Sequence, residues 1–211
     1  TSDKLYVNFL EVPNIENPKV PIFALGRCYS MSDPRYKRHG LSVRIYKSKN
    51  APASQATLFA YIFLNGINWV SKDPVDLITR IPPRHGDEDR LEVYLNRIKE
   101  LRGSGDKSEN AIISTSSLIC TSDYPKLHYG LKAIERREAV RNVFEASGEV
   151  HDKSVVVIED VTTTGATMYE AISTLQNAGA RQVIPIAIAF HPMNITLSGT
   201  EEVNIKIEGG S

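Results

Sequence analysis

The most constraining feature of the sequence is the stretch VVVIEDVTTTGATMYEA, which covers residues 155–171. Four apolar residues are followed by two acids, and then by a turn that is built largely from threonine with one glycine. An unbroken apolar run is typical of a strand that is buried on both faces of a parallel sheet. The stretch therefore predicts a buried strand that ends in two carboxylates and leads directly into a helix.

Strand-like and helix-like segments alternate from about residue 41 onward. The expected strands are residues 41–46, 75–81, 111–114, 154–158 and 183–189, and the expected helices are 54–70, 91–101, 130–144 and 168–178. Strands that alternate with helices imply a parallel sheet covered on both faces, so we expect an α/β, Rossmann-like fold over residues 41–211. Pro185 favours an edge position for the last strand. The proline-rich residues 1–40 do not fit the alternation and are predicted to form a small N-terminal flap or edge hairpin.

Composition limits the class of protein. A length of 211 residues suggests one domain with a small appendage. The chain has 25 Lys and Arg against 25 Asp and Glu, so it lacks the overall basic excess of a non-specific nucleic-acid binder. Two isolated cysteines, Cys28 and Cys120, predict reduced thiols in a cytoplasmic protein. No apolar run approaches about 18 residues, so we expect no membrane span.

The acids and threonines of the opening stretch suit a sugar phosphate. In doubly wound sheets, ligands bind outside the carboxyl ends of the strands, where Glu159 and Asp160 are expected. Their carboxylates can accept hydrogen bonds from a ribose diol or from water around Mg²⁺. A helix N-terminus attracts phosphate, and Gly165 permits a close backbone approach. The residues predicted to hold the phosphate are Thr162, Thr163, Thr164, Gly165, Ala166 and Thr167.

A purely structural role and two other phosphate-handling folds fit these residues less well. A threonine-capped helix behind two solvated acids would account for each residue alone, but not for their ordered combination. A P-loop is excluded because no G-x-x-x-x-G-K-[ST] sequence occurs. A receiver domain also has an acidic pair after a strand, but too little chain follows Asp160 to complete that fold.

The order of four apolar residues, ED, one apolar residue and TTTGAT closely resembles the phosphoribosyl-pyrophosphate (PRPP) binding motif of type I phosphoribosyltransferases. The upstream segment R-x-x-x-x-R-N-V-F, residues 136–144, is similar to the ComF-like branch of that family, without its zinc-ribbon cysteines. The resemblance implies the type I phosphoribosyltransferase fold, ribose contacts by Glu159 and Asp160, and phosphate contacts by residues 162–167. It also implies Mg²⁺ bound mainly through the pyrophosphate of PRPP.

Further candidates lie outside the motif. Arg84, His85 and Arg90 follow a predicted strand and could face a pyrophosphate, although a charged surface loop is an equal alternative. His191 follows the last strand, where the family often contacts the base, but a structural role is the stronger interpretation. The basic residues Lys132, Arg136, Arg137 and Arg141 are expected on a solvated helix face. Residues 121–129 are a candidate for a loop that closes over the site.

Two classes of function remain open at this point. The first is a phosphoribosyltransferase that transfers phosphoribosyl to or from a nitrogenous base and releases pyrophosphate. The second is a non-catalytic partner protein that senses PRPP or nucleotides or associates with nucleic acid. The expected ligand in both cases is a small phosphoribosyl compound, while a homodimer and a nucleic-acid or protein partner stay open.

Overall fold

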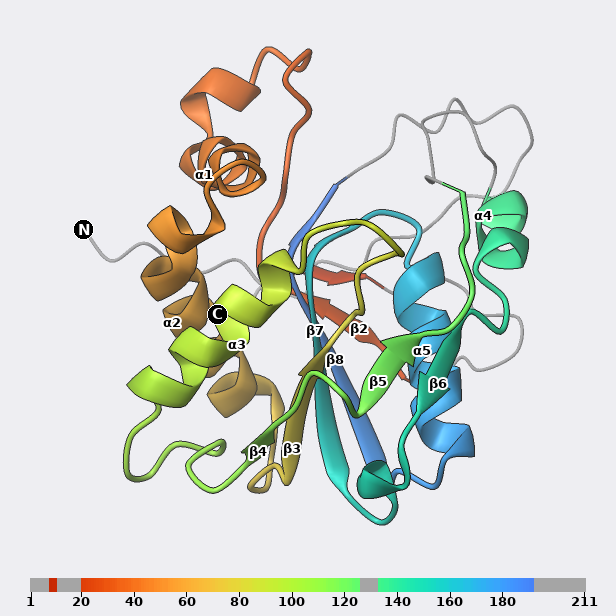
Figure 1. Ribbon diagram of the computed structural model, residues 1–211. Coiled ribbons are helices and arrows are strands. Elements are labelled where there is room, and N and C mark those ends of the chain that lie inside the picture. Colours follow the sequence, from red (N-terminus) through yellow and green to blue (C-terminus); the bar gives the residue numbers. More distant parts are fainter. Residues whose placement is uncertain (1–7, 11–19, 126–132, 192–211) are drawn as a thin grey trace.

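The computed structural model describes residues 8–10, 20–125 and 133–191, and a six-stranded sheet forms its centre (Figure 1). The strand order is β1-β2-β8-β7-β3-β4. The strands are β1 (Asn8–Leu10), β2 (Ile22–Ala24), β3 (Leu77–Arg80), β4 (Ile112–Ile113), β7 (Ser154–Thr162) and β8 (Gln182–Phe190). All neighbouring strands run parallel except β1, which pairs antiparallel with β2 at the edge.

Helices cover both faces of this sheet, as the sequence predicts. On one face lie α1 (Gly40–Ser48), α2 (Ala56–Val70) and α3 (Arg90–Leu101), and on the other lie α4 (Ala133–Ala139) and α5 (Ala166–Asn177) (Figure 1). A two-stranded ribbon of β5 (Leu118–Cys120) and β6 (Phe144–Ala146) lies beside α5. The central strand β7 packs against the helices on both faces of the sheet. Val156 and Ile158 pack with α2 and α3, while Val155 and Val157 pack with α5. The α/β fold with a mostly parallel sheet is therefore confirmed.

The most apolar helix packs its inner face into the core. Phe59, Phe63 and Ile67 of α2 are completely buried, which confirms the helix expected over residues 54–70. Its outer face is exposed in the single chain, since Tyr61 is 49% and Trp69 is 56% accessible. None of the helices in the described ranges has the length and apolar character that a membrane span requires.

The strand predicted over residues 41–46 is wrong, because these residues belong to helix α1. Leu41, Val43 and Ile45 alternate as in a strand, but the buried residues are Ser42, Ile45 and Ser48, which recur at helical spacing. The side chain of His39 accepts a hydrogen bond from the Ser42 N–H at 3.2 Å and caps the helix. Because serine is polar, the spacing of hydrophobic residues alone does not indicate that this face of α1 is buried.

The edge position suggested by Pro185 is also wrong, because β8 lies between β2 and β7. Leu25 donates its N–H to the carbonyl of Ala187, so the backbone of Ala187 faces β2. Pro185, two residues earlier, faces the same side, and the ladder with β2 begins only at Ile186. The missing N–H of Pro185 therefore falls just outside the ladder and costs no sheet hydrogen bond.

The helix expected over residues 130–144 is much shorter in the structure. Helix α4 ends at Ala139, and Phe144 already begins β6, while residues 130–132 lie outside the described part of the chain. Asn142 has a φ of 57°, a left-handed conformation that cannot continue a right-handed helix. The boundary at residue 40 between an N-terminal flap and the main domain stays a prediction.

The topology creates a crevice between β3 and β7. These two strands are neighbours, but β3 continues into α3 on one face and β7 continues into α5 on the opposite face. The loops that follow them therefore diverge, and this is the place where doubly wound sheets hold their ligands.

Candidate functional site

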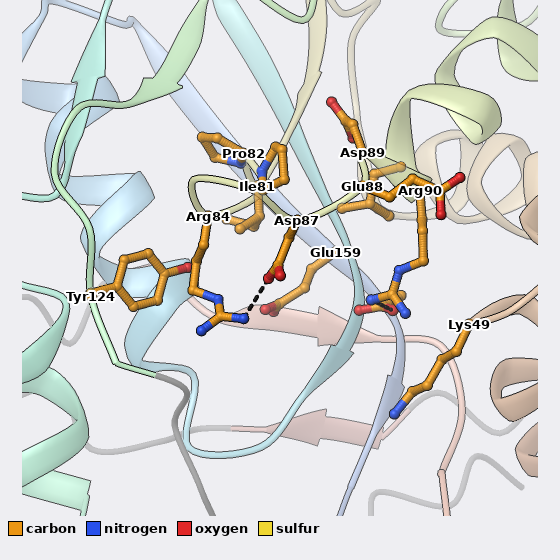
Figure 2. A pocket seen from close by; sticks show the side chains of 13 residues that line it. Lys49, Ile81, Pro82, Arg84, Asp87, Glu88, Asp89, Arg90, Tyr124 and Glu159 are labelled. Carbon is orange, nitrogen blue, oxygen red and sulfur yellow. Dashed lines mark hydrogen bonds and ion pairs between the residues drawn. The ribbon is translucent and has the colours of Figure 1, made fainter.

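A cavity of about 400 Å³ lies at this crevice. The residues after β3 form one wall and the acids at the end of β7 form another (Figure 2). The full lining consists of Lys49, Ile81, Pro82, Pro83, Arg84, Asp87, Glu88, Asp89, Arg90, Leu91, Tyr124, Glu159 and Asp160. Charged groups of both signs dominate this lining, so the cavity suits a polar, ionised ligand.

Asp160 contributes a carboxylate whose oxygens are already engaged. Its Oδ1 accepts a hydrogen bond from the Val161 N–H at 2.8 Å, and its Oδ2 lies 3.3 Å from Nη2 of Arg90. Arg90 is the first residue of α3, so this ion pair joins the two elements that diverge at the crevice. The structure thus brings Asp160 and Arg90 together, although 70 residues separate them in the sequence.

Glu159 is partly exposed as a residue, but its carboxyl group is enclosed by protein. Burial and the nearby charge of Asp160 raise the pKa of Glu159 to about 8, so its carboxyl group is largely protonated at neutral pH. The nearby Thr162 hydroxyl partly offsets this rise in pKa, but the buried Oε2 of Glu159 has no partner within hydrogen-bonding geometry among the described residues. An unsatisfied buried oxygen is costly and is expected to be paired when a ligand fills the site.

Strand β7 continues through both acids to Thr162, beyond the end predicted at residue 158, and the threonines that follow form the turn that opens α5. Thr162 is buried, and its Oγ1 also lacks a hydrogen-bond partner within the described ranges. The Oγ1 of Thr164 accepts the Ala166 N–H at 3.4 Å, and Gly165 adopts a φ of +76° just before the helix begins. The turn therefore directs the amino end of α5 toward the crevice. Unpaired N–H groups and a partial positive charge at this end of the helix favour binding of an anion.

Arg136 adds a cation beside this turn. Its Nη1 donates to Oγ1 of Thr163 at 3.2 Å, and only 3% of the residue is exposed. The expectation that Arg136 lies on a solvated helix face is therefore wrong. The burial of Arg136 could not be predicted from the sequence, because α4 is short and its charged residues leave no apolar face that would mark its buried side.

The loop between β3 and α3 is shaped by ion pairs. Buried Arg80 holds Asp89 through Nε at 2.8 Å and Nη2 at 2.7 Å, and Asp89 in turn caps α3 by accepting the Glu92 N–H. Arg84 pairs with Asp87 within the loop, as the dashed line in Figure 2 shows. These contacts fix the backbone from which Arg84 and Arg90 extend into the cavity.

The other candidates from the sequence are placed differently. His85 is exposed and does not line the cavity, whereas Arg84 and Arg90 do. His191 is buried at the end of β8, where its N–H donates to the carbonyl of Thr162 at 2.9 Å, and it does not line this cavity either. Of the loop expected over residues 121–129, residues 126–129 lie outside the described part of the chain, as does Lys132.

Two lining residues were not predicted individually, although Tyr124 lies within the loop expected over residues 121–129. Tyr124 follows β5, and its ring lies 5.9 Å from the Arg84 guanidinium, while burial raises the pKa of its phenol to about 12. Lys49 follows α1, which the sequence pattern wrongly suggested to be a strand. Both reach the site only through tertiary packing.

The described residues contain no group of three or more His, Cys, Asp or Glu side chains arranged to hold a metal ion. The carboxylates of Asp87 and Asp160 nevertheless line one cavity, and carboxylate oxygens are the protein ligands that Mg²⁺ prefers. Their chemistry fits a Mg²⁺ ion whose remaining ligands come from a bound molecule and from water.

The doubly wound sheet with a charged cavity at its switch point is the arrangement of an α/β ligand-binding domain. The model of the phosphoribosyl transferase domain matches residues 90–202, which is more than half of the chain. The protein therefore belongs to the phosphoribosyl transferase domain family.

Several solved structures are similar to this chain at low sequence identity. An allosteric regulatory enzyme of purine biosynthesis matches with a TM-score of 0.40 and 17% identity, over 65% of this chain and 26% of its own. Glutamine PRPP amidotransferase from B. subtilis matches with a TM-score of 0.39 and 18% identity, over 64% and 26%. The hypoxanthine phosphoribosyl transferase of Trypanosoma cruzi matches with a TM-score of 0.39 and 10% identity, over 68% and 75%.

The chain spans only about a quarter of the length of the first two of these proteins. No curated protein sequence matches it.

Proposed function

We propose that the protein binds Mg–PRPP, or the corresponding nucleoside monophosphate, in the cavity between β3 and β7. It then transfers phosphoribosyl to or from a nitrogenous base. The observation that carries this proposal is the run of groups along β7 and α5. The buried, unpaired Oε2 of Glu159 and the carboxylate of Asp160 are followed directly by the threonine turn at the amino end of α5. This order suits a ribose and its 5′-phosphate.

Each part of the ligand would meet different residues, and the ligand would extend beyond the cavity, because residues 162–167 follow the acids in sequence but are not among the cavity's lining residues. Asp160 and Glu159 would accept hydrogen bonds from the ribose hydroxyls, and residues 162–167 would surround the 5′-phosphate. The pyrophosphate would face Arg84 and Arg90, whose guanidinium groups suit phosphate oxygens. Mg²⁺, bound mainly through that pyrophosphate, would supply positive charge to the leaving group.

In the forward reaction, a ring or amino nitrogen of the base forms a bond to C1 of the ribose. The C1–oxygen bond breaks, its electron pair leaves on pyrophosphate, and the proton of the attacking nitrogen passes to solvent. The ribose gains positive charge in an oxocarbenium-like transition state, which the carboxylate of Asp160 stabilises electrostatically. The chain contributes by positioning and charge, and no residue need form a covalent bond to the sugar.

We also propose that the chain belongs to the ComF-like branch of the family, because the sequence of residues 136–144 resembles a segment of that branch. Arg136 opens this segment and contacts Thr163 of the turn, so the segment is physically linked to the proposed phosphate site. This placement leaves the acceptor base open.

The direct test is pyrophosphate release from Mg–PRPP in the presence of a panel of purine and pyrimidine bases. Release with at least one base, lost in Asp160→Asn but kept in Asp152→Asn, supports the enzyme. Asp152 is a suitable control because it lies exposed just before the opposite, amino end of the same strand. Binding of PRPP without release by any base would instead favour the non-catalytic, ligand-sensing alternative.

A further inference from the structure

Both arginines of the cavity are paired with carboxylates of the same cavity. Arg84 pairs with Asp87, and Arg90 pairs with Asp160 at 3.3 Å. All four side chains line the cavity, so the charges within each of these two pairs offset each other. An anionic ligand must therefore compete for groups that already have partners.

The pair at Asp160 affects the ribose end of the proposed site directly. Asp160 Oδ1 accepts the Val161 N–H and Oδ2 accepts Arg90 Nη2, so each oxygen already takes one hydrogen bond. A ribose hydroxyl that donates to Oδ2 must share that oxygen with the guanidinium or displace it. Arg90 thus occupies a contact that the proposed substrate needs.

The backbone of Arg90 is fixed, while its side chain is held weakly. A hydrogen bond from Nε and an ion-pair contact from Nη2 of buried Arg80 hold Asp89, the preceding residue, and Asp89 caps α3. The Arg90 contact with Asp160 is a single long hydrogen bond between partly exposed groups. Pairs of that kind contribute about 0–1 kcal/mol, so a stronger anionic partner can draw Arg90 away at little cost.

We propose that Arg90 is a specificity-determining residue that couples recognition of the diphosphate to recognition of the ribose. When a diphosphate enters, Arg90 moves from Asp160 to the phosphate oxygens, and the released carboxylate accepts the ribose hydroxyls. A ligand without a diphosphate, such as ribose 5-phosphate, leaves Arg90 on Asp160 and binds weakly. This inference rests on the proposed function, and it adds that diphosphate and ribose 5-phosphate strengthen each other's binding.

The test is the affinity of ribose 5-phosphate, measured by calorimetry with and without saturating Mg–pyrophosphate. In the parent protein, Mg–pyrophosphate should tighten ribose 5-phosphate binding by about fivefold or more, which is the low end of ordinary coupling between sites. In Arg90→Gln, ribose 5-phosphate alone should bind about two- to fivefold more tightly than to the parent, because Asp160 is free. The enhancement by Mg–pyrophosphate should fall below about twofold.

Arg97→Gln is the matched control, because Arg97 lies on the same helix and pairs with exposed Glu100. It should reproduce the coupling of the parent. Arg90→Lys should restore part of the coupling, since lysine keeps the charge but lacks the planar fork. Thermal melting of each variant shows whether it is folded before its affinities are compared.

Coupling that persists unchanged in Arg90→Gln would overturn the inference. So would a parent protein that binds PRPP but shows no effect of Mg–pyrophosphate on ribose 5-phosphate. Failure of the parent to bind PRPP itself would have a different meaning, because it would overturn the proposed function and this inference with it.

Discussion

At the scale of single residues, Glu159 combines burial, an unpaired oxygen and a charged neighbour. Its pKa of about 8 lies above its ordinary value of 4.5. Between these two values the folded protein keeps a proton that the unfolded chain has lost, so the contribution of Glu159 to stability decreases as the pH rises. This contribution is fully present below about pH 4.5 and is lost as the pH passes through 8.

Glu159→Gln should remove this dependence, because a glutamine side chain has nearly the same shape and stays neutral. We expect the melting temperature of the variant to rise relative to that of the parent between pH 5 and pH 8, and the difference to stay constant above about pH 9. Exposed Glu138→Gln should show no such trend and serves as the control. Parallel melting curves of Glu159→Gln and the parent across this range would show that the carboxyl titrates normally.

Gly165 is required by both its backbone and its surroundings. Its φ of +76° is unfavourable for residues with a Cβ, and an added Cβ would lie 2.8 Å from Cδ1 of Ile22. Gly86 has a similar φ of +79°, but nothing lies within 4 Å of its added Cβ. Comparing the two positions therefore separates backbone strain from the steric clash.

Gly86→Ala should lower the free energy of unfolding by about 1 kcal/mol, from strain alone. Gly165→Ala should lower it by at least about twice as much, because its Cβ would also meet the side chains of Ile22 and Tyr169. Gly165→Val should cost more still and weaken ligand binding by distorting the turn that is proposed to hold the phosphate. Urea unfolding of both alanine variants measures the difference. Equal losses at the two positions would contradict the close packing of Gly165 against Ile22.

At the scale of elements, α2 has an inner face that belongs to the core and an outer face that does not. Phe63→Ala should cost about 3–5 kcal/mol, because it removes a fully buried ring. Tyr61→Ala should change stability by less than about 0.5 kcal/mol, since that ring is half exposed. Urea unfolding of the two variants is the measurement, and a large cost at Tyr61 would mean that another surface covers α2.

Trp69 reports on the same outer face through its fluorescence. With 56% of its surface exposed, this only tryptophan should be quenched readily by acrylamide in the single chain. Resistance to quenching, together with a dimeric mass in solution, would contradict this expectation and place the outer face of α2 between two copies of the chain.

The sequence predicted some elements well and others poorly, for physical reasons. Strand β7, the turn and α5 were predictable because a fully apolar run, the acids and the threonines are adjacent and each has one dominant local preference. Helix α1 was mistaken for a strand because its buried face includes Ser42 and Ser48, which a hydrophobic pattern does not count. Strand β8 was wrongly predicted to lie at the edge of the sheet. A proline is tolerated inside the sheet here because the ladder with β2 begins only after Pro185, and the sequence does not reveal where that ladder begins.

At the scale of the whole molecule, the site is assembled by topology. The acids and the turn could be placed from one continuous stretch, but the opposite wall comes from the loop after β3, and Tyr124 and Lys49 come from further elements. Their approach depends on α3 and α5 leaving adjacent strands toward opposite faces, which no local pattern encodes. The contact between Arg90 and Asp160, which forms only through tertiary packing, therefore could not be predicted from the sequence.

In the proposed function, the carboxyl end of β7 holds the ribose of a phosphoribosyl ligand. Calorimetric titration of Mg–PRPP into the parent, Asp160→Asn and Asp152→Asn tests it most directly. Loss of a charge-assisted hydrogen bond worth about 1.5–3 kcal/mol should weaken binding to Asp160→Asn roughly ten- to a hundredfold. Its melting temperature should hardly change, because the ion pair with Arg90 is long and partly exposed. Asp152→Asn should bind like the parent. If Asp160→Asn binds Mg–PRPP as tightly as the parent does, the ribose does not lie at this strand end and the account is wrong.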